Sequence, residues 1–388
     1  MPTTPDSPAR LRYLDWTRGL AALIMLQGHT FHSFTRNDLR EGGPYVLSQY
    51  LGGIAPAIFL FLTGVTMAFR MDSDERKGLA PWTRVVSALS RARYLLVIAF
   101  LFRIQLWLFS LPGAPPSQVL KVDVLNCMAL TGAALSLLAL ASTIDRVKMG
   151  IAVGLFIAVA SPVVAQLDWS WAHPLLKQYL APDYLYFSLF PWGAFFAFGL
   201  GAGSIIRLLK DDQMDRAMQW AALIGAGCIV GGRYFAELPY SLYAKPSDFW
   251  LDSPTLAFIK LGVLLWILTF GFIWTRYAVG KSWSLVAQFG TTSLLVYWVH
   301  IELVYGRWLG VWKESLDTMQ ATILSIAVIG LMLLLSLART RKWITLPTTL
   351  WGGFSTRWPI SNRPLVADSK SATGIESRPT KRYPRTIS

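Results

Sequence analysis

The stretch LGGIAPAIFLFLTGVTMAF, residues 51–69, contains no charged side chain. It is close to the roughly 20 apolar residues that a helix needs to cross a bilayer. Similar runs recur along the chain, and they predict membrane spans at 16–36, 48–69, 92–111, 122–142, 149–166, 185–207, 217–234, 255–275, 284–306 and 319–338. Because lipid offers no hydrogen-bond partners to the backbone, such spans fold as helices. The sequence therefore predicts an all-α, polytopic bundle of about ten transmembrane helices.

The composition supports the same class. Of 388 residues, 54% are hydrophobic and only 15% are charged, whereas a soluble domain carries roughly a quarter charged residues. Cys127 and Cys228 lie in apolar runs, which favours small buried side chains over a disulfide. The four histidines and two cysteines show no zinc or iron–sulfur spacing, so we expect no bound metal.

The basic residues divide unequally between the two sides of the predicted membrane. Of 36 Lys and Arg, 25 lie in the N-terminus, the loops after even-numbered spans and the tail, and eight lie in the other loops. Arg18, Arg103 and Lys260 lie at or within spans. The positive-inside rule then predicts that both termini are cytoplasmic. The net charge of +14 follows this topology, so the expected partner is the lipid bilayer and not nucleic acid.

Three segments are expected along the chain: a cytoplasmic N-terminus at 1–15, a transmembrane domain at 16–338 and a basic, partly disordered cytoplasmic tail at 339–388. The loops 167–184 and 235–254 are rich in Trp, Tyr, Pro and Leu, which predicts that they lie along the outer interface. No internal repeat is evident, which disfavours transporter folds built from inverted halves. The oligomeric state is not predicted.

The first span, LDWTRGLAALIMLQGHTFHSF (residues 14–34), carries ionisable groups on one helix face. Arg18 and His29 are three turns apart, ~16 Å along the axis, with Asp15 and His32 near the same stripe. Asp15 and Arg18 have an alternative interpretation as an interfacial pair, and His32 as a solvated or capping residue. His29 lies beyond the middle of the span, where an ionisable group normally marks function.

Other polar residues fall in the same outer layer. Asp123 and Asn126 lie in the outer half of the fourth span, and His300 and Glu302 lie in that of the ninth. Arg103, near the middle of the third span, requires an anionic partner. Asp123 has the alternative interpretation of a helix N-cap, because Asp is common there.

Two more arginines, Arg91 and Arg93, lie at the cytoplasmic end of the third span. Each has the plain interpretation of a positive-inside anchor. Together with Arg18 they form a cluster that suits a polyanionic ligand such as a nucleotide-phosphate carrier.

Several stretches, in this order, resemble the transmembrane acyltransferases. They are RLRYLDWTRGLA (10–21) with His29 following, LGGIAPAIFLFLTGV (51–65), FLFRIQLWL (100–108) with VDVLNCMAL (122–130), and SLLVYWVHI (293–301). The Arg-to-His spacing resembles the acyltransferase 3 family. The other stretches are most similar to bacterial relatives of the heparan-alpha-glucosaminide N-acetyltransferase catalytic domain. The resemblance covers about residues 10–310.

The resemblance implies an enzyme that takes an acyl group, often acetyl, from cytoplasmic acyl-CoA (acetyl-CoA) as co-substrate. The acyl group passes to a hydroxyl or amine of a sugar or glycan on the far side of, we expect, a bacterial cytoplasmic membrane. His29 matches the catalytic base, and Arg18 matches the motif arginine on the donor side. Asp123 and Asn126 match the polar start of the later motif. In the lysosomal enzyme an asparagine stands where this chain has His29, so the choice between His29 and His32 as the base stays open.

The chemistry of acyl transfer fits these residues. A histidine base takes the proton of the attacking hydroxyl, and Asn126 or Arg103 is placed to stabilise the oxyanion. His29, Asp123 and Asn126 are the predicted catalytic residues. Arg18, Arg91, Arg93 and Arg103 are the predicted acyl-CoA-binding residues, and His32 and His300 the predicted acceptor-binding residues. Direct transfer and an acyl-histidine relay both remain open.

Two other classes compete with the acyltransferase. A transporter or flippase would use the intramembrane His, Arg and Asp for proton or anion coupling. A non-catalytic membrane scaffold would tolerate apolar residues at Arg18, His29 and Asp123.

Overall fold

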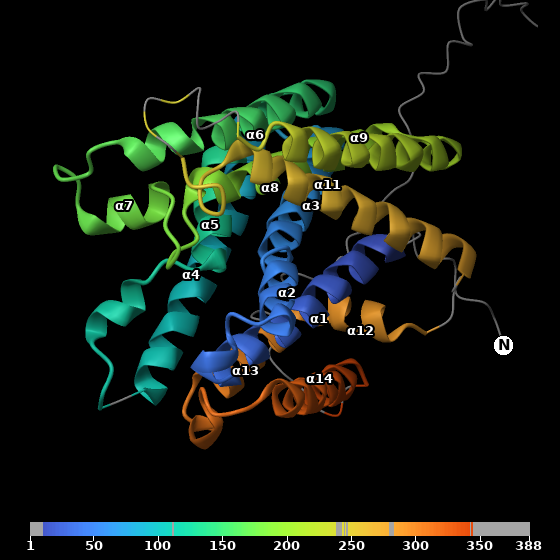
Figure 1. Ribbon diagram of the computed structural model, residues 1–388. Helices are drawn as coiled ribbons and strands as arrows, with labels where there is room; N and C mark the ends of the chain where they lie inside the picture. Colours follow the sequence, from blue (N-terminus) through green and yellow to red (C-terminus); the bar gives the residue numbers. More distant parts are fainter. Residues whose placement is uncertain are drawn as a thin grey trace, which may run out of the picture.

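The computed structural model (Figure 1) describes residues 11–110, 112–237, 243, 245, 247–278, 283–341 and 343. Over these residues the chain is helical, and its only strand-like pairing is an isolated parallel bridge between Thr35 and Leu316. The first ten residues of the predicted segment 1–15, most of the predicted tail 339–388 and part of the loop 235–254 lie outside the described residues.

Thirteen α-helices are labelled among the described residues. Their bounds are α1 Arg12–Phe34, α2 Gly43–Gly52, α3 Ala55–Arg76, α4 Pro81–Phe109, α5 Val124–Leu135, α6 Thr143–Gln166, α7 Pro174–Leu180, α8 Leu189–Leu208, α9 Met214–Tyr234, α11 Pro254–Ile273, α12 Leu285–Thr291, α13 Ser293–Tyr305 and α14 Thr318–Thr340. A short 3-10 helix, Ser136–Leu140, extends α5.

Six segments of this described part are long and apolar enough to cross a membrane. They are α2 with α3, α4, α6, α8, α11 with the turn that follows it, and α14. Each coincides with a predicted span. The other four predicted spans coincide with α1, α5, α9 and the α12–α13 pair, which are shorter or more polar. The chain is therefore an all-helical membrane protein, while the number ten and the orientation of the termini stay predictions.

Proline and small residues explain where the helices depart from the predicted spans. α3 and α4 begin with Pro56 and Pro81 in their first two positions, where the missing N–H costs nothing. The second predicted span is consequently two helices that meet at Gly53, and the third begins about three turns earlier than residue 92. The ninth span is also divided, because the backbone leaves the helical region at Thr292.

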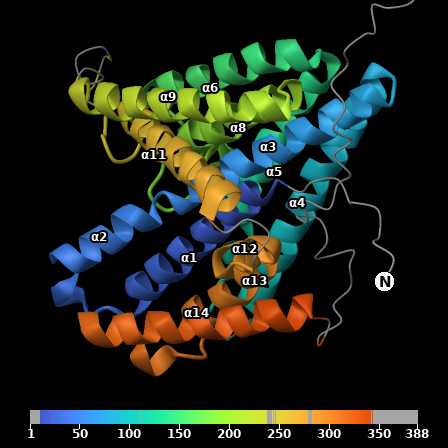
Figure 2. The same ribbon diagram turned by 90° about the vertical axis from the view of Figure 1, so that its right-hand side faces the viewer.

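Helix α1 is central to the bundle. In both views α6 and α9 lie on one side of the molecule and α14 lies on the opposite side (Figures 1 and 2). Residues of α1 contact α2, α3, α11, α12, α13 and α14. Two glycines allow α1 and α12 to touch: a Cβ on Gly19 would lie 1.7 Å from the Val286 carbonyl oxygen, and one on Gly290 would lie 1.8 Å from that of Asp15. This close packing resembles that of other membrane helices and fixes the position of α1.

The bundle has two chemically different ends. At one end, which we call the ion-pair end, the C-terminal turns of α3 and α8 meet the start of α6 through Asp72, Glu75, Arg146 and Arg207. At the other, which we call the histidine end, the C-terminal halves of α1, α4 and α13 meet the start of α5. The start of α8 lies at the same end, since the Cys127 thiol donates to the Ser188 carbonyl oxygen at 3.5 Å.

Candidate active site at the histidine end

Two histidines from distant parts of the chain meet at the histidine end. Nδ1 of His29 on α1 lies 3.0 Å from Nε2 of His300 on α13. The two rings are stacked, with centroids 5.2 Å apart and an angle of 15° between their planes. His300 is fully buried and His29 is half-buried. Among the described residues, no carboxylate lies within ion-pair distance of either ring.

The hydrogen bonds determine the tautomers of the neutral pair. Nδ1 of His300 lies 2.8 Å from the carbonyl oxygen of Val296, which can only accept, so this nitrogen carries the hydrogen. Nε2 of a neutral His300 is then an acceptor, and the contact requires His29 to donate through Nδ1. It follows that Nε2 of His29 carries a lone pair and is available to take a proton.

Aromatic side chains border this pair. The Tyr305 ring packs edge-on against His29, with centroids 5.3 Å apart, and lies 6.1 Å from His32. His32 is exposed, and its Nδ1 lies 3.3 Å from the Tyr45 hydroxyl. Tyr297 packs against His300 at 5.8 Å. The site therefore combines one buried imidazole, one half-buried imidazole and one exposed imidazole with tyrosines.

A second polar group lies beside the histidines. Arg103 Nε lies 3.2 Å from a carboxylate oxygen of Asp123, so the anionic partner predicted for Arg103 is present. The other oxygen of Asp123 accepts from the backbone N–H groups of Leu125 and Asn126, which confirms the N-cap interpretation. The Asn126 side chain completes the capping box and donates to the Tyr179 hydroxyl at 3.0 Å. Asp123 is thus both cap and counter-ion.

Tyr297 connects the two groups. It lies within electrostatic range of Asp123, Arg103 and Tyr305 while its ring contacts His300. Its neighbour Trp298 donates to the Gln105 side chain at 2.6 Å, which ties α13 to α4. The His29–His300 pair and the Arg103–Asp123 pair are therefore parts of one polar layer.

The remaining predicted arginines lie elsewhere. Arg18 is buried near the start of α1, with Nη1 3.5 Å from Asp15. Arg91 lies within electrostatic range of Arg18 and of Arg70 on α3, so cations from three helices gather there. Arg93 is exposed, because two positions along a helix rotate a side chain by about 200°. The structure brings Arg91, but not Arg93, toward Arg18.

Several members of the site were not singled out from the sequence. Tyr305, Tyr297, Tyr179 and Tyr45 lie among the many aromatic residues of the membrane interface, where Tyr is common for other reasons. Arg70 resembles any positive-inside anchor. Only their contacts distinguish them.

Comparison with known proteins places these helices in a family. The family model described as heparan-alpha-glucosaminide N-acetyltransferase, catalytic, matches residues 10–234. The match is more than half of the chain and includes Arg18, His29, Arg91, Arg103 and Asp123, while α13 with His300 lies beyond it. A search of curated proteins gave no match. The chain therefore belongs to the family of the heparan-alpha-glucosaminide N-acetyltransferase catalytic domain, and it is a membrane-embedded acyltransferase.

Proposed function

We propose that this protein moves an acetyl or similar acyl group from cytoplasmic acyl-CoA to a hydroxyl or amine of a sugar or glycan on the other side of a bacterial-type cytoplasmic membrane. In this proposal His29 is the base. The observation that carries it is the order of hydrogen bonds from the Val296 carbonyl through His300 to His29, because this order leaves the lone pair of His29 Nε2 available. His32, the alternative base, is exposed, and its Nδ1 contacts the Tyr45 hydroxyl, which can donate or accept and therefore does not determine the tautomer.

The proton follows a short route. The acceptor O–H or N–H gives its proton to Nε2 of His29 as its oxygen or nitrogen attacks the thioester carbonyl carbon. The C–S bond then breaks, and the CoA sulfur takes the proton from Nε2. Throughout, Nδ1–H of His29 donates to His300, and the hydrogen bond becomes charge-assisted while His29 is protonated. His300 therefore resembles the orienting member of a catalytic triad.

The donor side is proposed at the arginines near the start of α1. Arg18, Arg70 and Arg91 supply the positive charge that the CoA phosphates require. Arg18 and His29 are separated by ~16 Å along α1, a span that a long pantetheine arm suits. The charge asymmetry of the loops supports a cytoplasmic position for this end, and therefore for both termini.

The acceptor side is proposed between His29 and the Arg103–Asp123 pair. Asn126 Nδ2 uses one hydrogen for the Tyr179 hydroxyl, which leaves a second N–H for a substrate oxygen. Tyr305 and His32 offer a rim on which a sugar can stack or form hydrogen bonds. Asp123 holds Arg103 and the start of α5 in place, and we assign it a positioning role.

The test is acetyl-CoA binding and CoA release by the detergent-purified protein, with glucosamine as acceptor. Wild type, His29→Ala, Arg18→Ala and His173→Ala are compared, since His173 is an exposed histidine that only caps α7. The proposal expects His29→Ala to bind without turnover, Arg18→Ala to bind weakly, and His173→Ala to match wild type. Full turnover by His29→Ala would exclude the base assigned here. Trapping of an acetylated His29 after acid quench would select the relay over direct transfer.

A further inference from the structure

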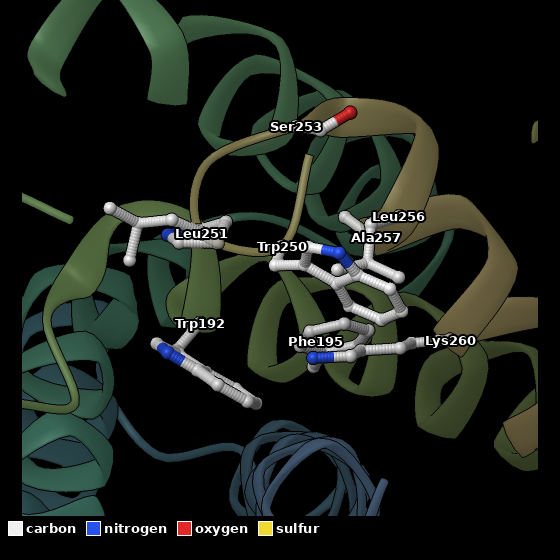
Figure 3. Close-up of a pocket in the computed structure, with 9 residues that line it drawn as sticks. Trp192, Phe195, Trp250, Leu251, Ser253, Leu256, Ala257 and Lys260 are labelled. Carbon is white, nitrogen blue, oxygen red and sulfur yellow. The ribbon is translucent and has the colours of Figure 1, made fainter. Parts of the chain in front are cut away.

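A separate hollow lies between the first turns of α8 and α11, away from the histidines. It is a shallow hollow that is partly open to solvent, and its enclosed part is small. Its walls are Trp192 and Phe195 from α8, Trp250 and Leu251 from the preceding loop, and Leu256 from α11. Lys260 is the one cation that lines it, and Figure 3 shows its side chain extending from α11 with the nitrogen directed towards Trp192.

Lys260 has no anion beside it in the described part of the chain. Its nitrogen lies 4.7 Å from the centroid of the Trp192 ring, in a cation–π contact. Two other basic residues of the predicted spans, Arg18 and Arg103, each have a carboxylate partner. A cation in an apolar, aromatic setting is costly unless an anion accompanies it.

Hydrogen bonds hold one wall of the hollow in place. Asp248 fixes the loop that carries Trp250: one oxygen accepts from the Trp250 backbone N–H at 2.9 Å, and the other from the Tyr184 hydroxyl at 2.5 Å. The Trp250 side chain is nevertheless 61% exposed, so it stands at the open side of the hollow. Both flanking helices are candidate membrane spans, and tryptophan is typical of the headgroup level.

We propose that this hollow binds the anionic headgroup of a membrane phospholipid. The phosphate pairs with Lys260, and the glycerol and upper acyl chains lie against Trp192, Trp250 and Leu256. The unequal distribution of Lys and Arg predicts that the starts of α8 and α11 lie in the outer leaflet, so the lipid enters from there. This inference does not depend on the reaction proposed above, because the hollow shares no residue with the histidine site.

The experiment measures the melting temperature of delipidated protein in a neutral detergent. Phosphatidylglycerol, phosphatidylcholine or inorganic phosphate is added to wild type, Lys260→Met, Lys260→Arg and Lys177→Met. Lys177 is an exposed lysine on α7 and serves as the charge-matched control. We expect phosphatidylglycerol to raise the melting temperature of wild type by at least about 3 °C at saturation, with little effect of phosphatidylcholine or phosphate.

The variants separate binding from folding. Lys260→Met should lose the increment due to phosphatidylglycerol and, without lipid, melt no lower than wild type, because it removes a half-buried charge from an aromatic setting. Lys260→Arg and Lys177→Met should keep the increment. An equal rise with phosphatidylcholine, an equal rise with inorganic phosphate alone, or a full increment in Lys260→Met would each overturn the proposal.

Discussion

The buried ion pairs at the ion-pair end and the His29–His300 pair at the histidine end hold titratable groups in opposite ways. At the ion-pair end, Asp72 is 3% exposed and accepts from Arg207 at 2.5 Å and pairs with Arg76 at 3.1 Å. Glu75 pairs with the fully buried Arg146 at 2.6 Å. At the histidine end, the two imidazoles bind each other and a backbone carbonyl, and one ring nitrogen keeps its lone pair.

This difference separates architecture from chemistry. The paired carboxylates and guanidinium groups hold α3, α6 and α8 together, and their charges are already matched within the protein. An imidazole whose Nε2 carries a lone pair is set up for proton transfer. Substitutions at the two ends should therefore affect different quantities: stability at the ion-pair end and turnover at the histidine end.

The largest effect is expected for His29→Ala. Loss of the base should lower kcat by roughly 10²–10⁴-fold, the usual contribution of a positioned acid–base group. The melting temperature should stay close to that of wild type, since His29 is half-buried and at the rim of the cluster. Steady-state CoA release and a thermal scan on the same preparation check both points. A large loss of stability with normal turnover per folded molecule would mean that His29 has a structural role and not a catalytic one.

Asp72→Asn tests the ion-pair end. It leaves Arg207 and Arg76 without their buried anion, and breaking such a pair typically costs about 3–5 kcal/mol. Denaturation in mixed micelles measures the loss, and turnover per folded molecule should be unchanged. Asp38→Asn is the control, because the Arg36–Asp38 pair is exposed and its loss should leave the unfolding midpoint where it was. If Asp72→Asn and Asp38→Asn lowered the free energy of unfolding equally, the buried ion pairs would not have the stabilising role proposed for them.

The next effect in size is expected for His300→Leu. It removes the acceptor for His29 Nδ1–H without touching the proposed reacting nitrogen. A hydrogen bond of this kind is worth about 1–3 kcal/mol, which corresponds to a fall of kcat of roughly 5–150-fold. KM for acetyl-CoA should change little. His300→Gln, whose side-chain oxygen can accept from His29, should recover part of the loss, whereas a merely space-filling role predicts that Leu and Gln behave alike.

The smallest effect concerns the loop before α11. Burial, together with the charge of the neighbouring Asp248, raises the pKa of Asp252 to about 6. A carboxyl with a raised pKa binds its proton more tightly when folded, so the protein loses stability as the pH rises from about 4 to 6. Asp252→Asn should remove this component and flatten the melting temperature over that range. If the melting temperature of Asp252→Asn fell with pH as steeply as that of wild type, Asp252 would not be the group responsible.

The sequence predicted much of the helix inventory and only part of the site. Every span predicted from an apolar run coincides with a helix or a pair of helices, because the local composition of a segment determines whether it can span the membrane. Helical periodicity placed Arg18 and His29 on one face because both lie on one helix. The alternative interpretations of Asp123 proved compatible, as the residue is both N-cap and partner of Arg103.

Contacts between helices could not be predicted from local composition or helical periodicity. His29 and His300 are 271 positions apart, and which outer-layer residues meet depends on helix packing. That packing depends on close approaches such as that of Gly19 to α12. A single glycine in a sequence does not indicate which helix will approach it. Arg93, expected with Arg91, is exposed, and its role in acyl-CoA binding stays a prediction. The tautomer of His29 depends on Val296, an apolar residue whose carbonyl carries no signal in the sequence.

The most direct test of the account is a double-mutant cycle on acetyl transfer with His29→Ala, His300→Leu and the double variant. If His300 acts only by orienting His29, the double variant should turn over at the rate of His29→Ala alone, because the second substitution then has nothing left to disturb. Losses that multiply, with the double variant slower than His29→Ala by the full factor of His300→Leu, would contradict the claim that the two histidines work as one unit.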